Sequence, residues 1–299
     1  MGRTLGKLVV ATLALSCAAC TRTGGSQPSG SSSAAPGPAA SAEKQSITIK
    51  GSDTMVILGQ RWAEDYMKAN PDTTVQVTGG GSGTGIAALI NGTTDVCESS
   101  RPMNDKEKED LKIKRSAVAV ETKVALDALA VYVNEKNPIK EISIPALRKI
   151  YTGETTSWKD VGGPAHAIIL YGRENNSGTY GYFKEHVLEK KDFAAATQTL
   201  AGTSAVVNAV KGDPYGIGYG GIAYLEGIRA LAVKKDDGAP AISPSLETSQ
   251  NGTYPISRFL YFYTAGPATG SAKKFIDWTI SADGQKVIGD VGYYPLPKS

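Results

Sequence analysis

The hydrophobic pattern of the chain first becomes regular at Ile47. From Ile47 to Gly51 apolar and polar residues alternate, which predicts a strand. Apolar residues then recur at fourfold spacing and predict the buried face of a helix: Leu58, Trp62, Tyr66 and Ala69. Asn70-Pro71 ends this helix, and Ser52-Asp53-Thr54 supplies residues that favour a helix start. The pattern therefore predicts a strand, a hydroxyl-rich turn and a helix.

The same arrangement occurs twice more along the chain. Val75 and Val77 alternate with polar residues before the glycine-rich stretch 78–85, and the apolar residues at 86–90 predict a helix after it. The segment 168–179 leads from a third strand through a polar turn into a helical stretch at 180–188. We find no internal repeat beyond this recurring turn.

The remaining pattern predicts further strands and helices in alternation. An apolar, β-branched run at 124–133 is typical of a central strand, and 256–264 predicts another strand that is rich in aromatic residues. Helices are predicted at 145–151 and 271–279, and the segment 216–224 predicts a strand that turns through glycines into a helix. Alternating strands and helices indicate an α/β fold, and 299 residues are enough for two lobes of ordinary domain size.

The recurring turns suggest a chemical role. A strand that turns into a helix leaves unpaired backbone N–H groups directed at one point, with the helix dipole behind them. Serine and threonine hydroxyls add donors, and Arg173, four residues before Ser177, offers a planar fork that can grip a tetrahedral oxyanion. Helix capping explains any one of these hydroxyls, and a flexible turn explains 78–85 taken alone. Three such turns together with an arginine favour a small-anion site.

Several other functions fit the sequence less well. The glycine-rich stretch lacks the lysine of a P-loop and the glycine spacing of a dinucleotide site, and no Gly-x-Ser-x-Gly elbow occurs. His166 and His186 have no evident nucleophile partner, which favours surface or packing roles. Two histidines and Cys97, the cysteine of the folded body, cannot build a typical zinc site. We therefore expect no metal, no cofactor and no catalytic residue.

The composition of the chain restricts the classes of molecule that the protein is expected to bind. The net charge of +3, with no long basic run outside the N-terminus, gives no basis for nucleic-acid binding. A hydrophobic content of 41% and a charged content of 20% are ordinary for a globular protein. No segment of about 18 apolar residues occurs after residues 1–19, so we expect no membrane span in the mature protein.

The first 45 residues have the pattern of an export signal followed by a tether. Residues 1–19 combine a basic start with an apolar run and small residues, which is typical of a signal peptide. The ending Cys17-Ala18-Ala19-Cys20 resembles a bacterial lipobox, and Cys20 is preferred over Cys17 as the lipidated residue. Residues 20–45 are rich in Ser, Gly, Pro and Ala and predict a flexible tether. Ordinary secretion without lipidation is the alternative.

Six motifs, in order over most of residues 47–297, resemble the phosphate-binding proteins of bacterial phosphate ABC importers. The Arg-x3-Ser-Gly-Thr element is the most specific of them. The motifs are Gly51-Ser-Asp-Thr54, Gly79-Gly-Gly-Ser-Gly-Thr-Gly85, Ser99-Ser-Arg-Pro-Met103, Arg173-Glu-Asn-Asn-Ser-Gly-Thr179, Gly216-Ile-Gly-Tyr219 and Tyr293-Tyr-Pro-Leu-Pro297.

The resemblance implies a type II periplasmic-binding-protein fold, in which two α/β lobes joined by two crossing strands enclose phosphate in a cleft. The strands would cross near 125–130 and 256–262, which makes lobe I 46–127 and 257–299 and lobe II 128–256. Arg101 is expected either to touch the anion or to pair with Asp53 or Glu98. The implied phosphate-binding residues are Ser52, Asp53, Thr54, Ser82, Gly83, Ser100, Arg101, Arg173, Ser177, Gly178 and Thr179.

One departure from the family bears on selectivity. Members often carry an aspartate in the position of Ser100, and it accepts the proton of hydrogen phosphate and so rejects sulfate. Here Asp53 or Glu98 would have to be the acceptor, and we prefer Asp53 because it lies in the first turn. A binder of another oxyanion (sulfate, molybdate or tungstate) and an enzyme acting on phosphate esters remain alternatives.

The resemblance also implies partners and location. The protein would be a monomer that delivers phosphate to the permease subunits of an ABC importer. It would be lipid-anchored in the cell envelope, in the periplasm or at the outer face of the cytoplasmic membrane.

Overall fold

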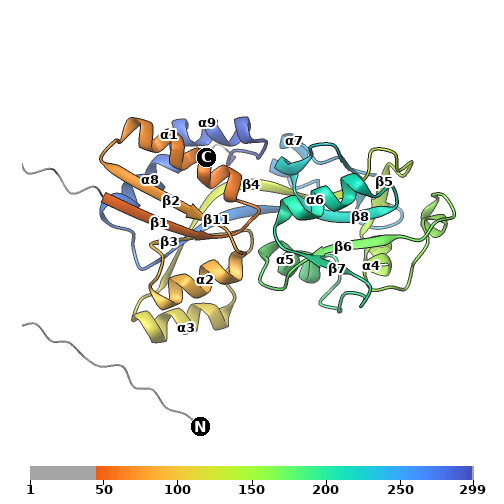
Figure 1. Cartoon of the computed structure of the whole chain (residues 1–299), viewed down its shortest axis with the longest axis horizontal. Coiled ribbons are helices and arrows are strands. Elements are labelled where there is room, and N and C mark those ends of the chain that lie inside the picture. Colours follow the sequence, from red (N-terminus) through yellow and green to blue (C-terminus); the bar gives the residue numbers. More distant parts are fainter. Residues whose placement is uncertain (1–44, 298–299) are drawn as a thin grey trace, which may run out of the picture. The chain divides into compact units, whose positions relative to one another are not determined.

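A computed structural model describes residues 45–297 of the chain (Figure 1). The expected signal peptide (1–19), the lipidation site Cys20 and all of the tether (20–45) except Gln45 lie outside the described residues. Within the described part, none of the helices combines the length and the apolar character needed to cross a membrane.

The described part is a mixed α/β structure, as predicted. Its strands are β1 (Gln45–Gly51), β2 (Thr73–Thr78), β3 (Val96–Ser99), β4 (Ala119–Val133), β5 (Glu141–Ser143), β6 (Ile169–Arg173), β7 (Gln198–Leu200), β8 (Gly216–Gly221), β9 (Arg229–Ala230), β10 (Ala232–Lys234) and β11 (Ser257–Ala265). Its helices are α1 (Val56–Ala69), α2 (Ser82–Asn91), α3 (Asp105–Arg115), α4 (Ile144–Tyr151), α5 (Gly178–His186), α6 (Thr203–Gly212), α7 (Leu246–Gln250), α8 (Gly270–Ile280) and α9 (Ala282–Val291). Two short 3-10 helices are η1 (Trp158–Val161) and η2 (Ile222–Tyr224).

The main sheet has two groups of strands connected by β4 and β11. The strand order is β2-β1-β3-β11-β4-β8-β6-β7, with β9 paired to β4 off this path. β4 pairs with β11 as far as Ala128 and with β8 from Leu129 onward. Figure 1 shows β4 and β11 running from the group around β1 to the group around β8. We call these groups the near half (β1, β2, β3 and their helices) and the far half (β6, β7, β8 and their helices); the lobe limits given above remain a prediction.

Helix α1 shows how the hydrophobic pattern forms the core of the near half. Leu58, Trp62 and Tyr66 are buried, and Trp62 meets Phe262 of β11 edge to face with ring centroids 5.6 Å apart. Edge-to-face contact is a preferred geometry of aromatic pairs. Ala69, which was predicted to share this face, is exposed, because it lies in the last turn of the helix.

Two helix starts differ from the sequence prediction. The N-cap of α1 is Met55 rather than a residue of Ser52-Asp53-Thr54, and no side chain caps this helix. The segment after β8 forms only the 3-10 turn η2 instead of a full helix. The side chains of Ser52, Asp53 and Thr54 are therefore left for contacts other than capping α1.

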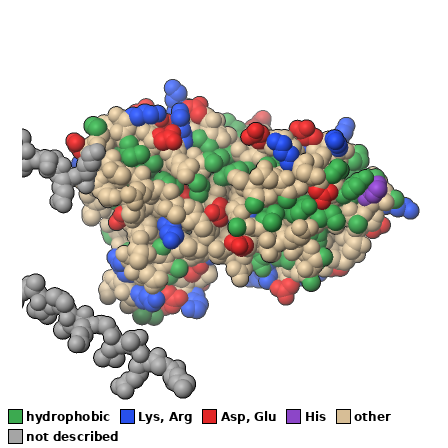
Figure 2. Space-filling model, viewed as in Figure 1, with side chains coloured by type: hydrophobic (Ala, Val, Ile, Leu, Met, Phe, Trp, Pro, Cys, Tyr) green, Lys and Arg blue, Asp and Glu red, His purple; other side chains and the backbone are tan. Residues whose placement is uncertain are grey.

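Charged side chains of both signs are mixed on the face of the molecule shown in Figure 2, where Lys and Arg side chains are interspersed with Asp and Glu. Cys97, the cysteine of the described part, is buried and unpaired.

Candidate anion site

The predicted site residues of the two halves meet directly. Thr54, in the turn before α1, lies with its Oγ1 2.8 Å from Oγ1 of Thr179, in the first turn of α5. Both residues are buried, at 1% and 0% exposure. The strand–turn–helix units at 47–69 and 168–188, which are far apart in the sequence, thus bring their hydroxyls to one point.

The second cluster of hydroxyls forms at the start of α2. The backbone N–H of Ser100 donates to Ser82 Oγ at 3.1 Å, and the two hydroxyl oxygens lie 3.4 Å apart. Gly178 closes over both serines, since a Cβ added to it would lie 2.3 Å from Ser82 Oγ and 2.6 Å from Ser100 Oγ. A side chain at this position would therefore collide with the serines, so glycine permits the contact.

Backbone groups also bind the two halves together. Gly83 N–H donates to the carbonyl of Asn176 at 2.8 Å, and Asn176 Nδ2 donates to the carbonyl of Gly80 at 3.0 Å. Tyr224 of η2 donates its hydroxyl to the carbonyl of Asp53 at 2.8 Å. Asn176 and Tyr224 were not among the predicted site residues; Asn176 stands inside the Arg-x3-Ser-Gly-Thr motif, which was the available signal.

Arg173 is the buried cation of the site. At the end of β6 it is 1% exposed; its Nη2 donates to Asp53 Oδ2 at 2.9 Å and its Nη1 to Thr203 Oγ1 at 2.9 Å. Burial lowers the pKa of Arg173, and the Asp53 carboxylate acts in the opposite direction. Its Nε has no hydrogen-bond partner among residues 45–297. Because a buried donor without an acceptor is costly, this nitrogen favours an anionic ligand.

Asp53 connects its own turn (52–54) and the glycine-rich stretch (78–85) to Arg173. Its Oδ1 accepts from Gly80 N–H at 2.7 Å, while Oδ2 accepts from Arg173. The side chain is 22% exposed. Each carboxylate oxygen therefore already has one strong donor, although a carboxylate offers about four acceptor positions in all.

Arg101 pairs with a residue that the sequence analysis did not consider. Its Nη2 and Nη1 donate to the two carboxylate oxygens of Glu107 at 2.6 and 2.8 Å, and Nη1 also reaches the carbonyl of Pro102. The hydrogen bond to Glu107 raises the pKa of Arg101. The prediction that Arg101 pairs with Asp53 or Glu98 is therefore wrong. Glu107 is also the acidic residue of the capping box at the start of α3, which explains why it lies within reach.

Glu98 is a buried carboxyl next to the site. It lies on β3, is 0% exposed, and neither of its oxygens has a hydrogen-bond partner among the described residues. Burial first, and the nearby Asp53 carboxylate second, raise the pKa of Glu98 well above its usual range. Both effects favour the neutral acid form of this carboxyl.

Helix capping accounts for only one of the predicted hydroxyls. Ser177 is the N-cap of α5, and its Oγ accepts from Tyr180 N–H at 3.3 Å. Ser82 accepts instead from Ser100 across the site, and Ser52 is buried with its N–H on the carbonyl of Glu98 at 2.9 Å. The hydroxyl pairs Thr54–Thr179 and Ser82–Ser100 thus do not serve as helix caps.

A buried ion pair behind Thr179 was missed from the sequence. Arg258 of β11 donates through Nε to Asp127 Oδ2 of β4 at 3.0 Å, and through Nη2 to Thr179 Oγ1 at 3.0 Å. The signal available was an arginine within the aromatic strand predicted at 256–264.

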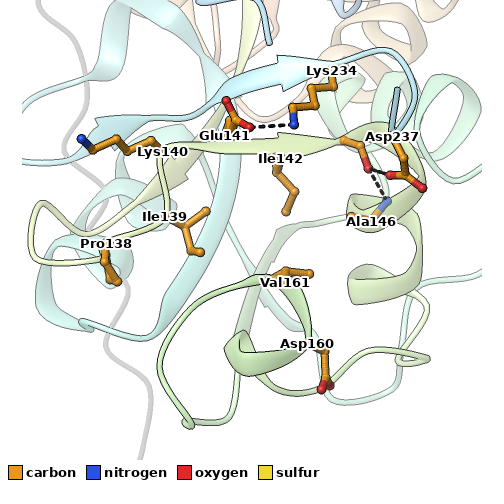
Figure 3. Close-up of a pocket in the computed structure, with 11 residues that line it drawn as sticks. Pro138, Ile139, Lys140, Glu141, Ile142, Ala146, Asp160, Val161, Lys234 and Asp237 are labelled. Carbon is orange, nitrogen blue, oxygen red and sulfur yellow. Dashed lines mark hydrogen bonds and ion pairs between the residues drawn. The ribbon is translucent and has the colours of Figure 1, made fainter. Parts of the chain in front are cut away.

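Other polar features lie apart from this cluster. A hollow of about 460 Å³ lies beside β5, and none of the predicted site residues lines it. Lys234 pairs with Glu141 there at 2.6 Å, and Figure 3 shows both among the lining side chains. His166 stacks on Tyr215, and His186 contacts Tyr182. Among the described residues, no group of three or more His, Cys, Asp or Glu side chains is placed to hold a metal ion.

Comparison with known proteins places the chain in a family. The model of the PBP superfamily domain matches residues 35–283. The phosphate-binding protein PstS of Pseudomonas aeruginosa is 34% identical over 275 residues, covering 86% of this chain and 85% of the relative. PstS of Bacillus subtilis is 34% identical over 290 residues, covering 97% and 92%.

Comparison with solved structures indicates the same family as the sequence relatives do. A substrate-binding protein from Clostridium perfringens, assigned to phosphate ABC transport and holding bound phosphate, superposes with a TM-score of 0.76 at 26% identity. The match covers 85% of this chain and 100% of the other. The predicted two-lobe fold of type II periplasmic binding proteins is thereby confirmed. The chain belongs to the PBP superfamily and, within it, to the family of the phosphate-binding proteins PstS.

Proposed function

We propose that this protein captures inorganic phosphate between its two halves and delivers it to the permease of an ABC importer. The observation that carries the proposal is the pairing of buried hydroxyls, Thr54 with Thr179 and Ser82 with Ser100, next to the ion pair of Asp53 with the buried Arg173. One guanidinium and several hydroxyl and N–H donors satisfy a tetrahedral oxyanion without water. The relatives named PstS and the phosphate-bound structure from Clostridium perfringens support the same ligand.

Capture requires no covalent chemistry. The near half presents Thr54, Ser82 and Ser100, and the far half presents Arg173 together with the start of α5. Closure of the halves about β4 and β11 then surrounds the anion, and the ligand shifts the population toward the closed state. We assign to the site all predicted residues except Arg101, whose guanidinium is held by Glu107.

Selectivity for phosphate depends in this proposal on an acceptor for its proton. Asp53 is the candidate, because its carboxylate pairs with Arg173 and lies in the same turn as Thr54. Both of its oxygens already accept one N–H, which favours a weaker rejection of sulfate than a free aspartate would give. Binding of another tetrahedral oxyanion is therefore the second candidate function.

We further propose that the chain is exported and anchored through Cys20, with residues 20–45 as a tether. The support is the lipobox-like sequence before Cys20. Mass spectrometry of the envelope-bound protein tests this directly. A lipid-modified N-terminal peptide starting at Cys20 is expected, and an unmodified mature N-terminus would contradict it.

The phosphate proposal is tested by ligand-dependent thermal stabilisation. Phosphate should raise the Tm of the unaltered protein, because a ligand that binds only the folded state stabilises it by mass action. Arg173→Met should lose this shift, through a loss of affinity of about a hundredfold or more. Arg148→Met is the control, since Arg148 pairs with Glu189 away from the cluster. An equal shift in both variants would contradict the role of Arg173.

A further inference from the structure

Arg258 is a buried arginine on the strand that joins the two halves. Its side chain is 2% exposed, and Asp127, its direct neighbour in the antiparallel register of β11 and β4, is fully buried. Asp127 Oδ1 in turn accepts the N–H of Ile222 at 3.0 Å, at the start of η2. The ion pair therefore connects both crossing strands to the far half.

Helix α5 holds the same guanidinium at two points. Arg258 Nη2 donates to Thr179 Oγ1 at 3.0 Å, and the ring of Tyr182 lies 5.3 Å from the Arg258 carbon that bears the three nitrogens. Tyr182 also donates its hydroxyl to the carbonyl of Ser257 at 2.8 Å. The start of α5 is thereby fixed to β11 at the position where Thr179 meets Thr54.

The hydrogen bond from Arg258 determines whether the Thr179 hydroxyl acts as a donor or as an acceptor toward its other neighbours. A threonine hydroxyl has one hydrogen to donate and two lone pairs that accept. Arg258 occupies one lone pair with a charge-assisted N–H, so the hydrogen of Thr179 is directed to the remaining neighbours, Thr54 Oγ1 or a bound anion. A second nitrogen of Arg258, Nη1, is buried without a partner among residues 45–297.

From this geometry we propose that Arg258, held by Asp127, is a positioning residue of the anion site. It orients the Thr179 hydroxyl as a donor to the anion. This rests on the proposed function and extends it: β11, one of the two strands about which the halves close, also carries a residue that affects the affinity for the anion. A purely structural ion pair would stabilise the hinge without affecting the ligand.

The test uses a variant that removes the pair without leaving a buried charge. Arg258→Met alone would strand the Asp127 carboxylate and can prevent folding. The double variant Asp127→Asn/Arg258→Met keeps an amide oxygen for the Ile222 N–H and removes both charges. Calorimetric titration with phosphate should show an affinity lower by about tenfold to a hundredfold. The matched control Arg148→Met/Glu189→Gln removes another ion pair of the far half and should stay within about twofold.

A double-mutant cycle with Thr179→Val identifies the route. If Arg258 acts through the Thr179 hydroxyl, the loss of affinity in the triple variant should be clearly smaller than the sum of the separate losses. Additive losses, or a double variant that binds phosphate as tightly as the unaltered protein, would overturn the inference. If the unaltered protein takes up sulfate and not phosphate, the substrate proposal fails, and the same cycle measured with sulfate decides the role of Arg258. Binding of neither anion would overturn both.

Discussion

Glu98 is an ionisable group in a buried environment that raises its pKa and so favours its neutral form. It is completely buried on β3, and a Cβ added to Gly59 of α1 would lie 2.7 Å from its Oε2. A glycine as the fourth residue of α1 thus makes room for the carboxyl. Since the pKa is raised in the folded protein, the stability that the neutral acid provides is fully present below the pKa of the unfolded chain. It is lost as the pH rises toward the folded pKa.

Glu98→Gln is therefore expected to change how stability depends on pH. The free energy of unfolding of the unaltered protein should fall, relative to the variant, as the pH rises above the pKa of an ordinary glutamate (about 4.3), because the glutamine cannot ionise. Urea denaturation at several pH values measures this difference. Glu109→Gln, at an exposed position of α3, is the control. Parallel pH profiles of unaltered protein and Glu98→Gln would contradict the neutral-acid assignment.

Gly178 is a residue at which the closed arrangement depends on a missing side chain. Its backbone needs no special conformation, but a Cβ would lie within 2.6 Å of the hydroxyls of Ser82 and Ser100. We expect Gly178→Ala to weaken phosphate binding at least tenfold while it leaves the Tm of the ligand-free protein nearly unchanged. Gly212→Ala, where nothing lies within 4 Å, is the control in the same titration. Unchanged affinity in Gly178→Ala would show that the halves do not close as described.

At the start of α5 the site residue Ser177 also caps the helix, whereas at the start of α1 the site residue Thr54 does not. Ser177 caps α5, so Ser177→Ala should lower the free energy of unfolding by about 1 kcal/mol. Thr54 caps nothing, because the N-cap of α1 is Met55 and no side chain caps this helix. Thr54→Val should therefore lower phosphate affinity about tenfold with little change in stability. Denaturation and titration of both variants separate the two roles; a large loss of stability in Thr54→Val would argue against this division.

Local patterns in the sequence were sufficient for most elements around the site. The fourfold spacing of Leu58, Trp62 and Tyr66 reflects one helix face, and the three strand–turn–helix units depend on residues close in sequence. The charged helix α3 was missed because Leu111 is its one buried residue, so it carries almost no hydrophobic periodicity.

Contacts between distant segments could not be predicted in the same way. The partner of Arg101 is set by the capping of α3, and the role of Arg258 by its register opposite Asp127 across β4. The shift of the α1 N-cap to Met55 depends on where Ser52 binds β3. Each of these is decided by packing between elements rather than by spacing along the chain.

At the scale of the whole described part, closure should be visible in backbone hydrogen exchange. The N–H of Gly83 in the near half is bonded to the carbonyl of Asn176 in the far half. Phosphate should slow exchange in a peptide spanning this position, because the bond persists only while the halves are closed. The Arg173→Met protein should show no such slowing. Equal exchange with and without phosphate in the unaltered protein would contradict ligand-driven closure.

Phosphate capture is tested most directly by isothermal titration calorimetry of protein stripped of bound ligand, first with phosphate and then with sulfate at neutral pH. The account predicts tight one-to-one binding of phosphate and much weaker heat from sulfate, with Asp53 as the proton acceptor. Heat from sulfate alone would support the assignment of these residues as an oxyanion site but would contradict phosphate as its ligand. No heat from either anion would contradict the assignment of the buried Arg173 cluster as an oxyanion site.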